Sequence, residues 1–537
     1  MTQQNKPVVF IAAGEQLAVL LLCLTAALGA VVWSWRSGAM LNYGDAVAHL
    51  HIARRVFDAR LPRFSMLGSV WLPLPHLLML PFVQAYGWWG SGAAALPSSV
   101  LSYLAGCVGL YRLARRWLQP QPAALALAFF ALNPNLLYLQ TTAMTEPLFL
   151  CEMIWLAEWM VEWRESLDSN PRRAQRLHCL IALLLVAAVF TRYDGWIMAA
   201  IAWTGIGLAL LRRGRLRSWS FWLASALVIA APLAWFVYNA VCFGDFLEFA
   251  RGPYSAKAIE IRTASHGAGP PHPGWHNCRV SLLFFMKAAE MDAVAAAWGN
   301  VLLALSALGT IWAWLAKRKQ AFLWALLLWL PMPFYAYSVA YSSVPIFLPC
   351  WWPHSWYNTR YGMELLPALA LGLGFGLHVL LAAVREFKPT WGSFAAYFLF
   401  AVLGLNALQM VREHPLTYME GVKNLQARRP FEQEIPAALR AELARRPGAT
   451  ILMNTSVYPN LVAFTGIPLR QTVNESDLWI FHEALQAPAT HAQLILAFDG
   501  DVVDQAVKAH PEGLVAVRSF TASGQAPGTL YRSLELP

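Results

Sequence analysis

The sequence has little charge for its length. Only 13% of its 537 residues are Asp, Glu, Lys or Arg, whereas 58% are hydrophobic. A soluble domain carries about 25% charged residues. A chain this poor in charge has too few polar side chains to cover its surface in water, but lipid solvates apolar side chains well. The composition therefore excludes soluble, disordered, collagen-like and disulfide-scaffold proteins, and it predicts a polytopic membrane protein.

The sequence also lacks the motifs of common soluble enzymes. It contains no Walker loop, no GxGxxG after a strand, no HExxH and no GxSxG. Its seven cysteines are scattered. Cys242, Cys278 and Cys350 fall in segments predicted to lie outside, and a disulfide between two of them stays open because sequence alone does not pair them. The net charge of +10 indicates basic loops facing anionic lipid headgroups, so no nucleic-acid partner is expected.

Eleven stretches, give or take two, have the length and apolarity of a membrane-spanning helix, which needs about 17–25 residues. They cover residues 16–33, 98–114, 120–137, 147–161, 178–191, 196–211, 219–238, 294–316, 321–340, 361–384 and 391–411. The segment Leu72–Trp89 is also apolar, but Pro73, Pro75 and Pro81 interrupt it. Since proline breaks helices, we expect a broken helix in the membrane interface there.

The basic residues predict the orientation of these spans. If the N-terminus is cytoplasmic, the inside segments carry Lys6, Arg112, Arg115, Arg116, Arg164, Arg172, Arg173, Arg176, Arg212, Arg213, Arg215, Arg217, Lys317, Arg318, Lys319, Arg385 and Lys388. The short outside loops carry at most one basic residue each, Arg192 or Arg360. The positive-inside rule therefore predicts a cytoplasmic N-terminus, with the long loops 35–97 and 239–293 and the C-terminus on the periplasmic or extracellular side.

The chain changes character near its end, after a transmembrane domain predicted to cover residues 1–411. Charged residues become more frequent in residues 412–537, and short apolar runs alternate with polar helical stretches. These runs are Thr450–Met453, Gln493–Phe498 and Leu514–Val517. Strand-like runs separated by helices predict a small extracytoplasmic α/β domain.

The first outside loop places a carboxylate just beyond a span. Asp45 lies there with a helical stretch behind it, so it could act as a general base at the lipid–water boundary. On a helix Asp45 and His49 lie one turn apart on the same face, and they could share a metal or a substrate. The alternative, to which we give equal weight, is that Asp45 only N-caps this helix.

Three further outside loops carry ionisable residues. Glu146 opens a span at bilayer-edge depth, where a carboxylate is costly and usually functional, although it could simply favour the helix N-terminus. Arg192 and Asp194 are two residues apart and could pair with each other. Arg360 starts a helix among aromatic residues, where a guanidinium could fork onto a phosphate or snorkel to the interface.

The order of spans, outside loops with ionisable residues and C-terminal domain resembles the GT-C superfamily of membrane glycosyltransferases. The resemblance is greatest to the branch of protein O-mannosyltransferases and lipid A aminoarabinose transferases. The likeness covers about 400 residues in architecture but only a few short motifs. These are Tyr43-Gly44-Asp45, Trp71-Leu72-Pro73-Leu74-Pro75-His76, Glu146 and Arg360-Tyr361. Many relatives carry two adjacent carboxylates in the first loop, whereas Ala46 follows Asp45 here. Any role of the second carboxylate would then fall to His49 or be absent.

The resemblance implies a function: inverting transfer of a sugar from a polyprenyl-phosphate donor to a lipid, glycan or protein acceptor, at the outer face of a bacterial inner membrane. Asp45 would be the catalytic base and Arg360 the phosphate clamp, with Arg192 and Tyr361 beside it. Glu146 and His49 would hold the acceptor or a metal. The remaining candidates for the site are Tyr43, Asp194 and His76.

No tightly bound metal is expected to be required. Asp45, His49 and Glu146 would offer ligands suited to zinc or manganese, but they come from two loops without a recognised spacing. The main alternative function, a membrane transporter, predicts ionisable residues near the bilayer midplane and inverted repeats, and the sequence has neither. If the protein were instead a non-catalytic membrane scaffold, its C-terminal domain would carry the function.

Overall fold

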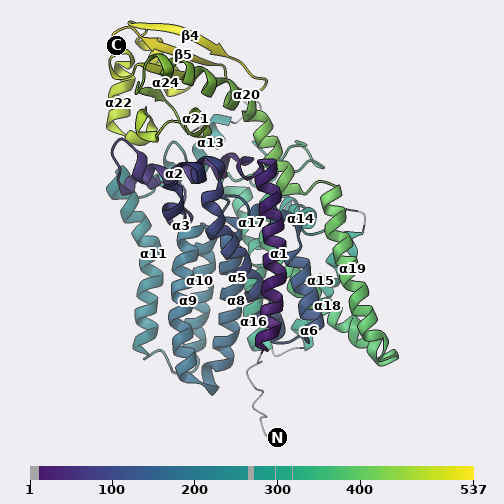
Figure 1. Cartoon of the computed structure of the whole chain (residues 1–537). Helices are drawn as coiled ribbons and strands as arrows, with labels where there is room; N and C mark the ends of the chain where they lie inside the picture. Colours follow the sequence, from purple (N-terminus) through teal and green to yellow (C-terminus); the bar gives the residue numbers. More distant parts are fainter. Residues whose placement is uncertain (1–10, 264–270, 297, 317–318, 457) are drawn as a thin grey trace. The chain divides into compact units, whose positions relative to one another are not determined.

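The chain is mostly helical and divides into two compact units. The computed structural model describes residues 11–263, 271–296, 298–316, 319–456 and 458–537 (Figure 1). The first unit, here called the helical unit, comprises Met1–Ser34, Ser98–Thr141 and Thr145–Glu420. The second, here called the sheet unit, comprises Trp35–Pro97, Thr142–Met144 and Gly421–Pro537. Lys6, Lys317 and Arg318, which contribute to the predicted orientation, lie outside the described residues.

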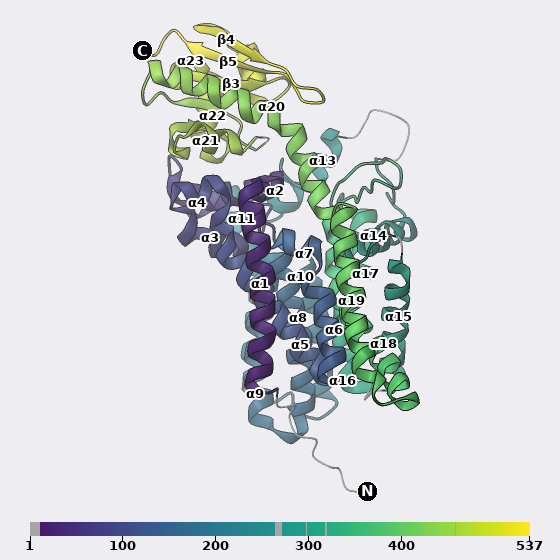
Figure 2. The same cartoon turned by 45° about the vertical axis from the view of Figure 1, so that its right-hand side comes forward.

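The helical unit is a bundle of long apolar helices (Figures 1 and 2). Its α-helices are α1 (Ala13–Ser37), α5 (Leu96–Arg115), α6 (Pro120–Ala131), α7 (Pro134–Leu139), α8 (Glu146–Ser169), α9 (Pro171–Thr191), α10 (Asp194–Leu211), α11 (Trp219–Phe243), α12 (Glu248–Arg251), α13 (Ala256–Thr263), α14 (Cys278–Ala293), α15 (Gly299–Ala316), α16 (Lys319–Ala325), α17 (Pro331–Tyr341), α18 (Leu366–Phe387) and α19 (Trp391–Arg412). Two 3₁₀ helices, η4 (Leu326–Trp329) and η5 (Thr359–Leu365), precede α17 and α18. The protein is an integral membrane protein.

Among the described residues, nine helical segments are long and apolar enough to cross a membrane. They correspond to nine of the eleven predicted spans, and the other two also coincide with helices. The predicted span 120–137 is interrupted because Pro134 begins the separate helix α7, which Asn133 caps by accepting the backbone N–H groups of Asn135 and Leu136. The predicted span 147–161 lies in α8, a helix of full length that carries many acidic residues.

The helical unit is packed closely around α18, which contacts α15, α6 and α19. Glycines make the closest of these approaches possible. A side chain on Gly309 of α15 would collide with the carbonyl oxygen of Gly372 in α18, and one on Gly376 would collide with the carbonyl oxygen of Leu305. Small residues of this kind let two helix backbones approach within a membrane.

One end of the helical unit collects the predicted inside segments. Arg116 at the end of α5 and Arg173 at the start of α9 both bind Glu162 of α8, at 3.1 and 2.6 Å. Arg213, just after α10, binds Asp168 at 3.5 Å. Three separate basic segments therefore meet the acidic second half of α8 at one end of the bundle. The side of the membrane on which this end lies stays a prediction.

The sheet unit contains a five-stranded mixed sheet. Its strands are β1 (Ile451–Met453), β2 (Thr472–Val473), β3 (Leu494–Phe498), β4 (Leu514–Phe520) and β5 (Gly528–Ser533). Their order is β2-β1-β3-β5-β4; β1 is parallel to β2 and β3, and β5 is antiparallel to β3 and β4. The three predicted strand-like runs are confirmed as β1, β3 and β4, whereas β2 and β5 were not predicted.

Much of the rest of the sheet unit consists of helices. They are α2 (Gly44–Asp58), α3 (Leu74–Val83), α4 (Tyr86–Ser91), α21 (Asn460–Thr465), α22 (Trp479–Gln486), α23 (Pro488–His491) and α24 (Val502–Ala509), with η1 (Ala39–Leu41), η2 (Phe64–Leu67), η3 (Ala93–Ala95), η6 (Leu469–Gln471) and η7 (Glu475–Asp477). The predicted break in Leu72–Trp89 is confirmed, because α3 and α4 are both too short to span a membrane.

A single helix, α20 (Leu416–Arg445), contributes residues to both units. It follows the last apolar helix, α19, and the predicted domain boundary after residue 411 stays a prediction. All seven cysteines lie within the described ranges, and none of them, including Cys242, Cys278 and Cys350, is in a disulfide in this structure.

The orientation gives the first testable prediction. Because the basic segments meet at one end of the bundle, we expect that end to be cytoplasmic and the C-terminal region to lie outside. Alkaline phosphatase, which is active only outside, should be active when fused after Ala438. A fusion after Gly214, in a basic segment, is the matched control and should be inactive. The opposite pattern of activities would contradict the orientation.

Candidate active site

Five of the predicted site residues lie in one buried cluster of the helical unit, here called the ionic cluster. They come from four points of the chain. Glu146 begins α8, Arg192 follows the end of α9, Asp194 begins α10, and Arg360 and Tyr361 belong to η5. Loops at the ends of the helices therefore bring charges that are far apart in sequence into one apolar environment.

Arg360 is held by carboxylates on two sides. Its Nε donates to Oε1 of Glu146 at 3.1 Å, and its Nη1 donates to Oε1 of Glu420 at 2.5 Å. Only 5% of Arg360 is exposed, and both carboxylates are 1% exposed. Charge-assisted hydrogen bonds in so dry an environment hold the guanidinium in one orientation.

Arg192 has partners on all three nitrogens of its guanidinium. Its Nε donates to Asp194 at 3.1 Å and its Nη1 to Glu146 at 3.3 Å. Its Nη2 lies 2.8 Å from the hydroxyl of Tyr335 and 2.9 Å from a carboxylate oxygen of Glu364. Each of the three nitrogens of this guanidinium thus has a partner. Glu146 accepts from both arginines, which links them into one network.

Tyr361 lies between the two guanidiniums. The centre of its ring is 5.2 Å from the Cζ atom of Arg192 and also 5.2 Å from that of Arg360. The ring of Tyr335 stacks on it with centroids 5.0 Å apart. Cations favour the face of an aromatic ring, so Tyr361 keeps two like charges close together and partly compensates their repulsion.

Gly362 allows η5 to pack directly against α14. A side chain on Gly362 would collide with the backbone nitrogen of Ala289, and its Cβ would lie 2.7 Å from Oδ2 of Asp292. Only glycine fits this contact without moving one of the two segments. The position of Arg360 therefore depends on a glycine two residues further along the chain.

Glu420 of α20 binds the beginning of η5. Its carboxylate accepts the backbone N–H groups of Asn358 and Thr359 at 3.0 and 2.9 Å, and the hydroxyl of Thr359 at 2.6 Å. The first N–H groups of a helix have no partner within the helix, so a carboxylate there satisfies them. Asn358 needs this support because its backbone is left-handed, with φ 54°.

The ionic cluster has more acidic than basic groups. Two guanidiniums contact four carboxylates, from Glu146, Asp194, Glu364 and Glu420. Asp292 of α14 is a fifth carboxyl group, 1% exposed, and neither of its oxygens has a hydrogen-bond partner among the described residues. Burial, and the nearby charges of Glu420 and Glu146, hold the pKa of Asp292 well above its usual range. This shift favours the protonated, uncharged form of Asp292.

Four residues of the cluster were not predicted: Tyr335, Glu364, Glu420 and Asp292. Glu364 gave a usable signal, since it is a carboxylate within the predicted span 361–384 and therefore needs a partner. The others gave none. Tyr335 is one of many aromatic residues, Asp292 precedes a span, and Glu420 lies in a charged segment after the last span.

The other predicted site residues belong to the sheet unit. Asp45 is half-buried in the first turn of α2. The N-cap position is taken by Tyr43, two residues before Asp45, so Asp45 is not the N-cap residue of this helix. The backbone before α2 is held by Arg428 of α20, whose Nη2 donates to the carbonyl oxygen of Asn42 at 2.9 Å.

His49 and His76 form a buried pair. Nδ1 of His49 and Nε2 of His76 are 2.8 Å apart, and the ring of Trp71 lies against His49 with centroids 4.5 Å apart. A hydrogen bond between two imidazoles needs one donor and one acceptor nitrogen. Burial, with the positive charges of His49 and Arg55, keeps the pKa of His76 well below its usual value, so His76 is neutral.

The sequence offers Asp45, His49 and Glu146 as possible metal ligands, although no tightly bound metal is expected to be required. In the part of the chain that the structure describes, no group of three or more His, Cys, Asp or Glu side chains is placed to hold a metal ion. We therefore derive no step that passes through a metal.

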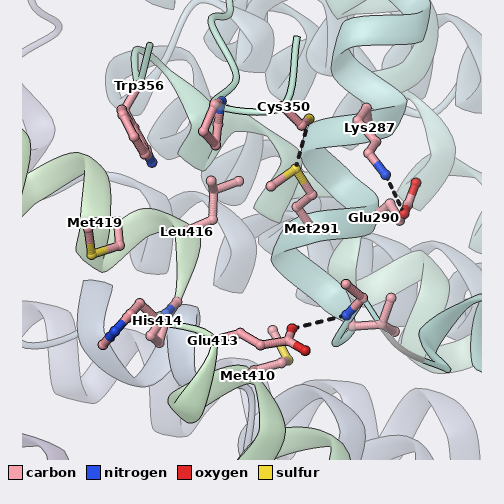
Figure 3. Close-up of a pocket in the computed structure, with 14 residues that line it drawn as sticks. Lys287, Glu290, Met291, Cys350, Trp356, Met410, Glu413, His414, Leu416 and Met419 are labelled. Carbon is pink, nitrogen blue, oxygen red and sulfur yellow. Dashed lines mark hydrogen bonds and ion pairs between the residues drawn. The ribbon is translucent and has the colours of Figure 1, made fainter. Parts of the chain in front are cut away.

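A cavity of about 350 Å³ is lined by residues of α14, of the loop before η5, of the end of α19 and of the start of α20 (Figure 3). Its lining is largely apolar and includes Met291, Met419 and Trp356. Met291 and Met419 directly precede Asp292 and Glu420, so the cavity and the cluster share the same two helices as walls. Methionine side chains adapt to ligands of irregular shape.

Comparisons with known proteins identify the fold. No protein-family model and no curated protein matches the chain. The crystal structure of ArnT from Cupriavidus metallidurans bound to undecaprenyl phosphate is similar over 95% of this chain and 97% of that chain, with 15% identity and a TM-score of 0.55. An oligosaccharyltransferase from Archaeoglobus fulgidus, tethered with an acceptor peptide, is matched over 97% of this chain and 74% of that chain, with 11% identity and a TM-score of 0.43. The second score does not establish a shared fold.

The likeness to ArnT confirms the predicted fold class. The chain has a GT-C-like fold, with a membrane-spanning helical bundle and a small C-terminal sheet region. At 15% identity the comparison concerns the fold alone, and the roles of individual residues do not follow from it.

The buried acid gives a prediction for stability. Folded Asp292 keeps a proton that the unfolded chain releases above pH of about 4, so the free energy of unfolding falls as pH rises through and beyond this value. Asp292→Asn keeps the shape but does not titrate. We expect its melting temperature in detergent to match that of the wild type near pH 4.5 and to exceed it by about 2 °C or more at pH 8.

The exposed Asp499→Asn is the control, and it should leave the melting temperature unchanged at both pH values. A difference between Asp292→Asn and wild type that stays constant with pH would show that Asp292 is not a buried neutral acid.

Proposed function

We propose that the protein is a glycosyltransferase that moves a sugar from a polyprenyl-phosphate donor to an acceptor at the membrane surface. The observation that carries the proposal is the buried pair of guanidiniums, Arg192 and Arg360, at the helix ends of a GT-C-like fold. A sugar transfer of this kind produces a phosphate anion in an apolar environment, and such an anion needs preorganised cations.

The fold supports a lipid-phosphate substrate. The ArnT structure of the same fold was determined with undecaprenyl phosphate bound. In this chain, the largely apolar cavity lined by Met291, Met419 and Trp356 offers a surface for the lipid part of a substrate.

The proposed reaction inverts the anomeric carbon of the sugar. A carboxylate takes the proton from the acceptor group, the acceptor atom bonds to the anomeric carbon, and the bond from that carbon to the donor phosphate oxygen breaks. The electron pair of that bond leaves with the polyprenyl phosphate. General-base help of this kind is commonly worth about 100- to 10,000-fold in rate.

The two arginines take different roles in this proposal. Every nitrogen of Arg192 already has a partner, so Arg192 orients Glu146 and Tyr361 and adds positive charge rather than forking onto a phosphate. Arg360 is the phosphate-binding residue. Because the surrounding carboxylates outnumber the guanidiniums, the phosphate must compete with Glu146 for Arg360, or a carboxyl group must take up a proton.

Asp45 is the proposed catalytic base. It lies in the first turn of α2, is half-buried and is supported by the backbone that Arg428 holds. The His49–His76 pair stands one helical turn further on and offers hydrogen-bonding groups for an acceptor. We further propose that the transferred sugar is a hexose or a pentose, and that the acceptor is a lipid, a glycan or a protein. The reaction would take place on the periplasmic side of a bacterial inner membrane.

One experiment distinguishes a glycosyltransferase from the two alternative functions, a membrane transporter and a non-catalytic membrane scaffold. Purified protein in detergent is incubated with a panel of polyprenyl-phosphate sugars and a membrane lipid extract, and free polyprenyl phosphate is measured. A transferase releases polyprenyl phosphate and forms a glycosylated product. A transporter binds or moves the donor without releasing it, and a scaffold does neither.

Asp45→Asn tests the base. The change keeps the shape and removes the proton acceptor, so we expect the turnover number to fall by about 100- to 10,000-fold with the donor affinity retained. The matched control is the exposed Asp499→Asn, which should be fully active. A purified Asp45→Asn variant with near-normal turnover would remove Asp45 from the mechanism.

Arg360→Ala tests phosphate recognition through two ligands that differ only in the phosphate. The variant should bind undecaprenyl phosphate about 10- to 100-fold more weakly than the wild type, because a charge-assisted fork is lost. It should bind undecaprenol as the wild type does. Arg360→Lys should recover only part of the difference, since an ammonium lacks the planar pair of donors.

The exposed Arg412→Ala removes the same charge elsewhere on the helical unit and should change neither affinity. Equal affinity of the wild type and Arg360→Ala for undecaprenyl phosphate would exclude Arg360 as the phosphate-binding residue.

A further inference from the structure

The first turns of α20 carry a carboxylate that contacts Arg360 and the backbone beside it. Glu420 accepts the Nη1 hydrogen bond of Arg360 at 2.5 Å and, with its two oxygens, the N–H groups of Asn358 and Thr359. It is 1% exposed, so water does not compete for these bonds. One side chain therefore binds both the head group of the proposed phosphate-binding residue and the start of the helix on which that residue stands.

We propose that Glu420 is a positioning residue, which sets the direction in which Arg360 presents its guanidinium to the donor phosphate. The proposal rests on the proposed function and deepens it. Glu420 touches neither donor nor acceptor in this scheme. It acts through Arg360 alone.

The geometry of the backbone shows why a separate anchor is needed. Asn358, directly before η5, has φ 54°, a left-handed conformation that costs free energy in a residue other than glycine. Its side chain donates to the carbonyl oxygen of Pro345 at 2.8 Å, and its N–H donates to Glu420 at 3.0 Å. Without Glu420 this turn can relax, and Arg360, two residues later, would move with it.

The other carboxylate on Arg360 cannot take over this role. Glu146 contacts Nε of Arg360 at 3.1 Å, but it also accepts from Arg192. A phosphate that binds Arg360 competes with Glu146 for the same guanidinium. Glu420 is different because its backbone bonds to residues 358 and 359 persist whatever binds Arg360, so it can hold the arginine in place during the exchange.

Glu420 is itself held in position by neighbouring residues. Thr417, one turn earlier in α20, donates its N–H and its hydroxyl to Oδ1 of Asn135, each at 2.9 Å. Nδ2 of Asn135 donates to the carbonyl oxygen of Asp292 at 3.0 Å. The start of α20 is thus bound to α7 and α14, and the carboxylate of Glu420 is preorganised. A misplacement of about 1 Å in a site of this kind can cost 100-fold.

Glu420→Gln keeps the shape of the side chain and removes its charge, and the comparison of two ligands separates positioning from folding. Its amide oxygen, at the position of Oε2, can still accept from the N–H and the hydroxyl of Thr359. Its amide N–H₂, at the position of Oε1, meets Nη1 of Arg360 and the N–H of Asn358, and two donors do not bond. We expect the affinity for undecaprenyl phosphate to fall about 10-fold or more, with the affinity for undecaprenol unchanged. Thr359→Val removes one bond to Glu420 without changing the charge, and it should cause a smaller loss of the same kind.

A double-mutant cycle with Arg360→Ala tests whether Glu420 acts through Arg360. If it does, Glu420→Gln will weaken undecaprenyl phosphate binding in the wild-type protein and have no further effect in Arg360→Ala. The control is Glu434→Gln, which removes a carboxylate from an exposed position of the same helix and should be silent in both backgrounds.

Each outcome of the cycle is decisive. Losses that multiply in the double variant, or an equal loss of undecaprenol binding, would mean that Glu420 only supports the fold, and the inference would fall. If Glu420→Gln does not fold, Thr359→Val is used in the same cycle with the same criteria. If the wild type itself binds undecaprenyl phosphate no better than undecaprenol, the proposed function falls, and the inference falls with it.

Discussion

The helical unit depends on the need to pair buried carboxylates with very few cations. Glu146, Asp194, Glu364 and Glu420 come from four different helices, yet they share Arg192 and Arg360. Removing one partner of a buried ion pair commonly costs about 3–5 kcal/mol, because the other charge is left without compensation. The starts of α8, α10, η5 and α20 are therefore tied to the same two guanidiniums, and none of these segments can move independently of the others.

This constraint explains which parts of the molecule could be predicted from the sequence. Hydropathy acts over consecutive residues, so the apolar helices and the broken segment Leu72–Trp89 were correctly predicted. Local signals also indicated Glu146, Arg192 and Arg360 as site residues. The pairing of Glu146 with Arg360 joins positions 214 residues apart, and no pattern within one sequence reports such a contact. The predicted span 120–137 was too long because Pro134 starts a new helix. The segments on both sides of this break are largely apolar, so hydropathy did not reveal it.

The largest omission in the sequence-based prediction was α20. Its segment is charged and follows the last apolar helix, so it had the composition of a soluble region and suggested no contact with the membrane-embedded charges. In the structure it supplies one anchor in each unit: Glu420 binds Arg360 in the helical unit, and Arg428 binds the backbone before Asp45 in the sheet unit. Charge in this helix thus serves to hold proposed site residues as well as to keep its surface soluble.

The excess of carboxylates around the two arginines is consistent with the proposed chemistry. A sugar attached through a polyprenyl phosphate is a phosphodiester with one negative charge, whereas the released polyprenyl phosphate is a monoester whose second pKa is about 6. Negative charge therefore grows at the phosphate as the sugar leaves. Cations without counter-charges would stabilise this transition state but would also hold the product tightly. Arg360 meets the developing charge, while Glu146, Glu364 and Glu420 limit the total positive potential, so the same site can bind the donor, assist its cleavage and still release the product.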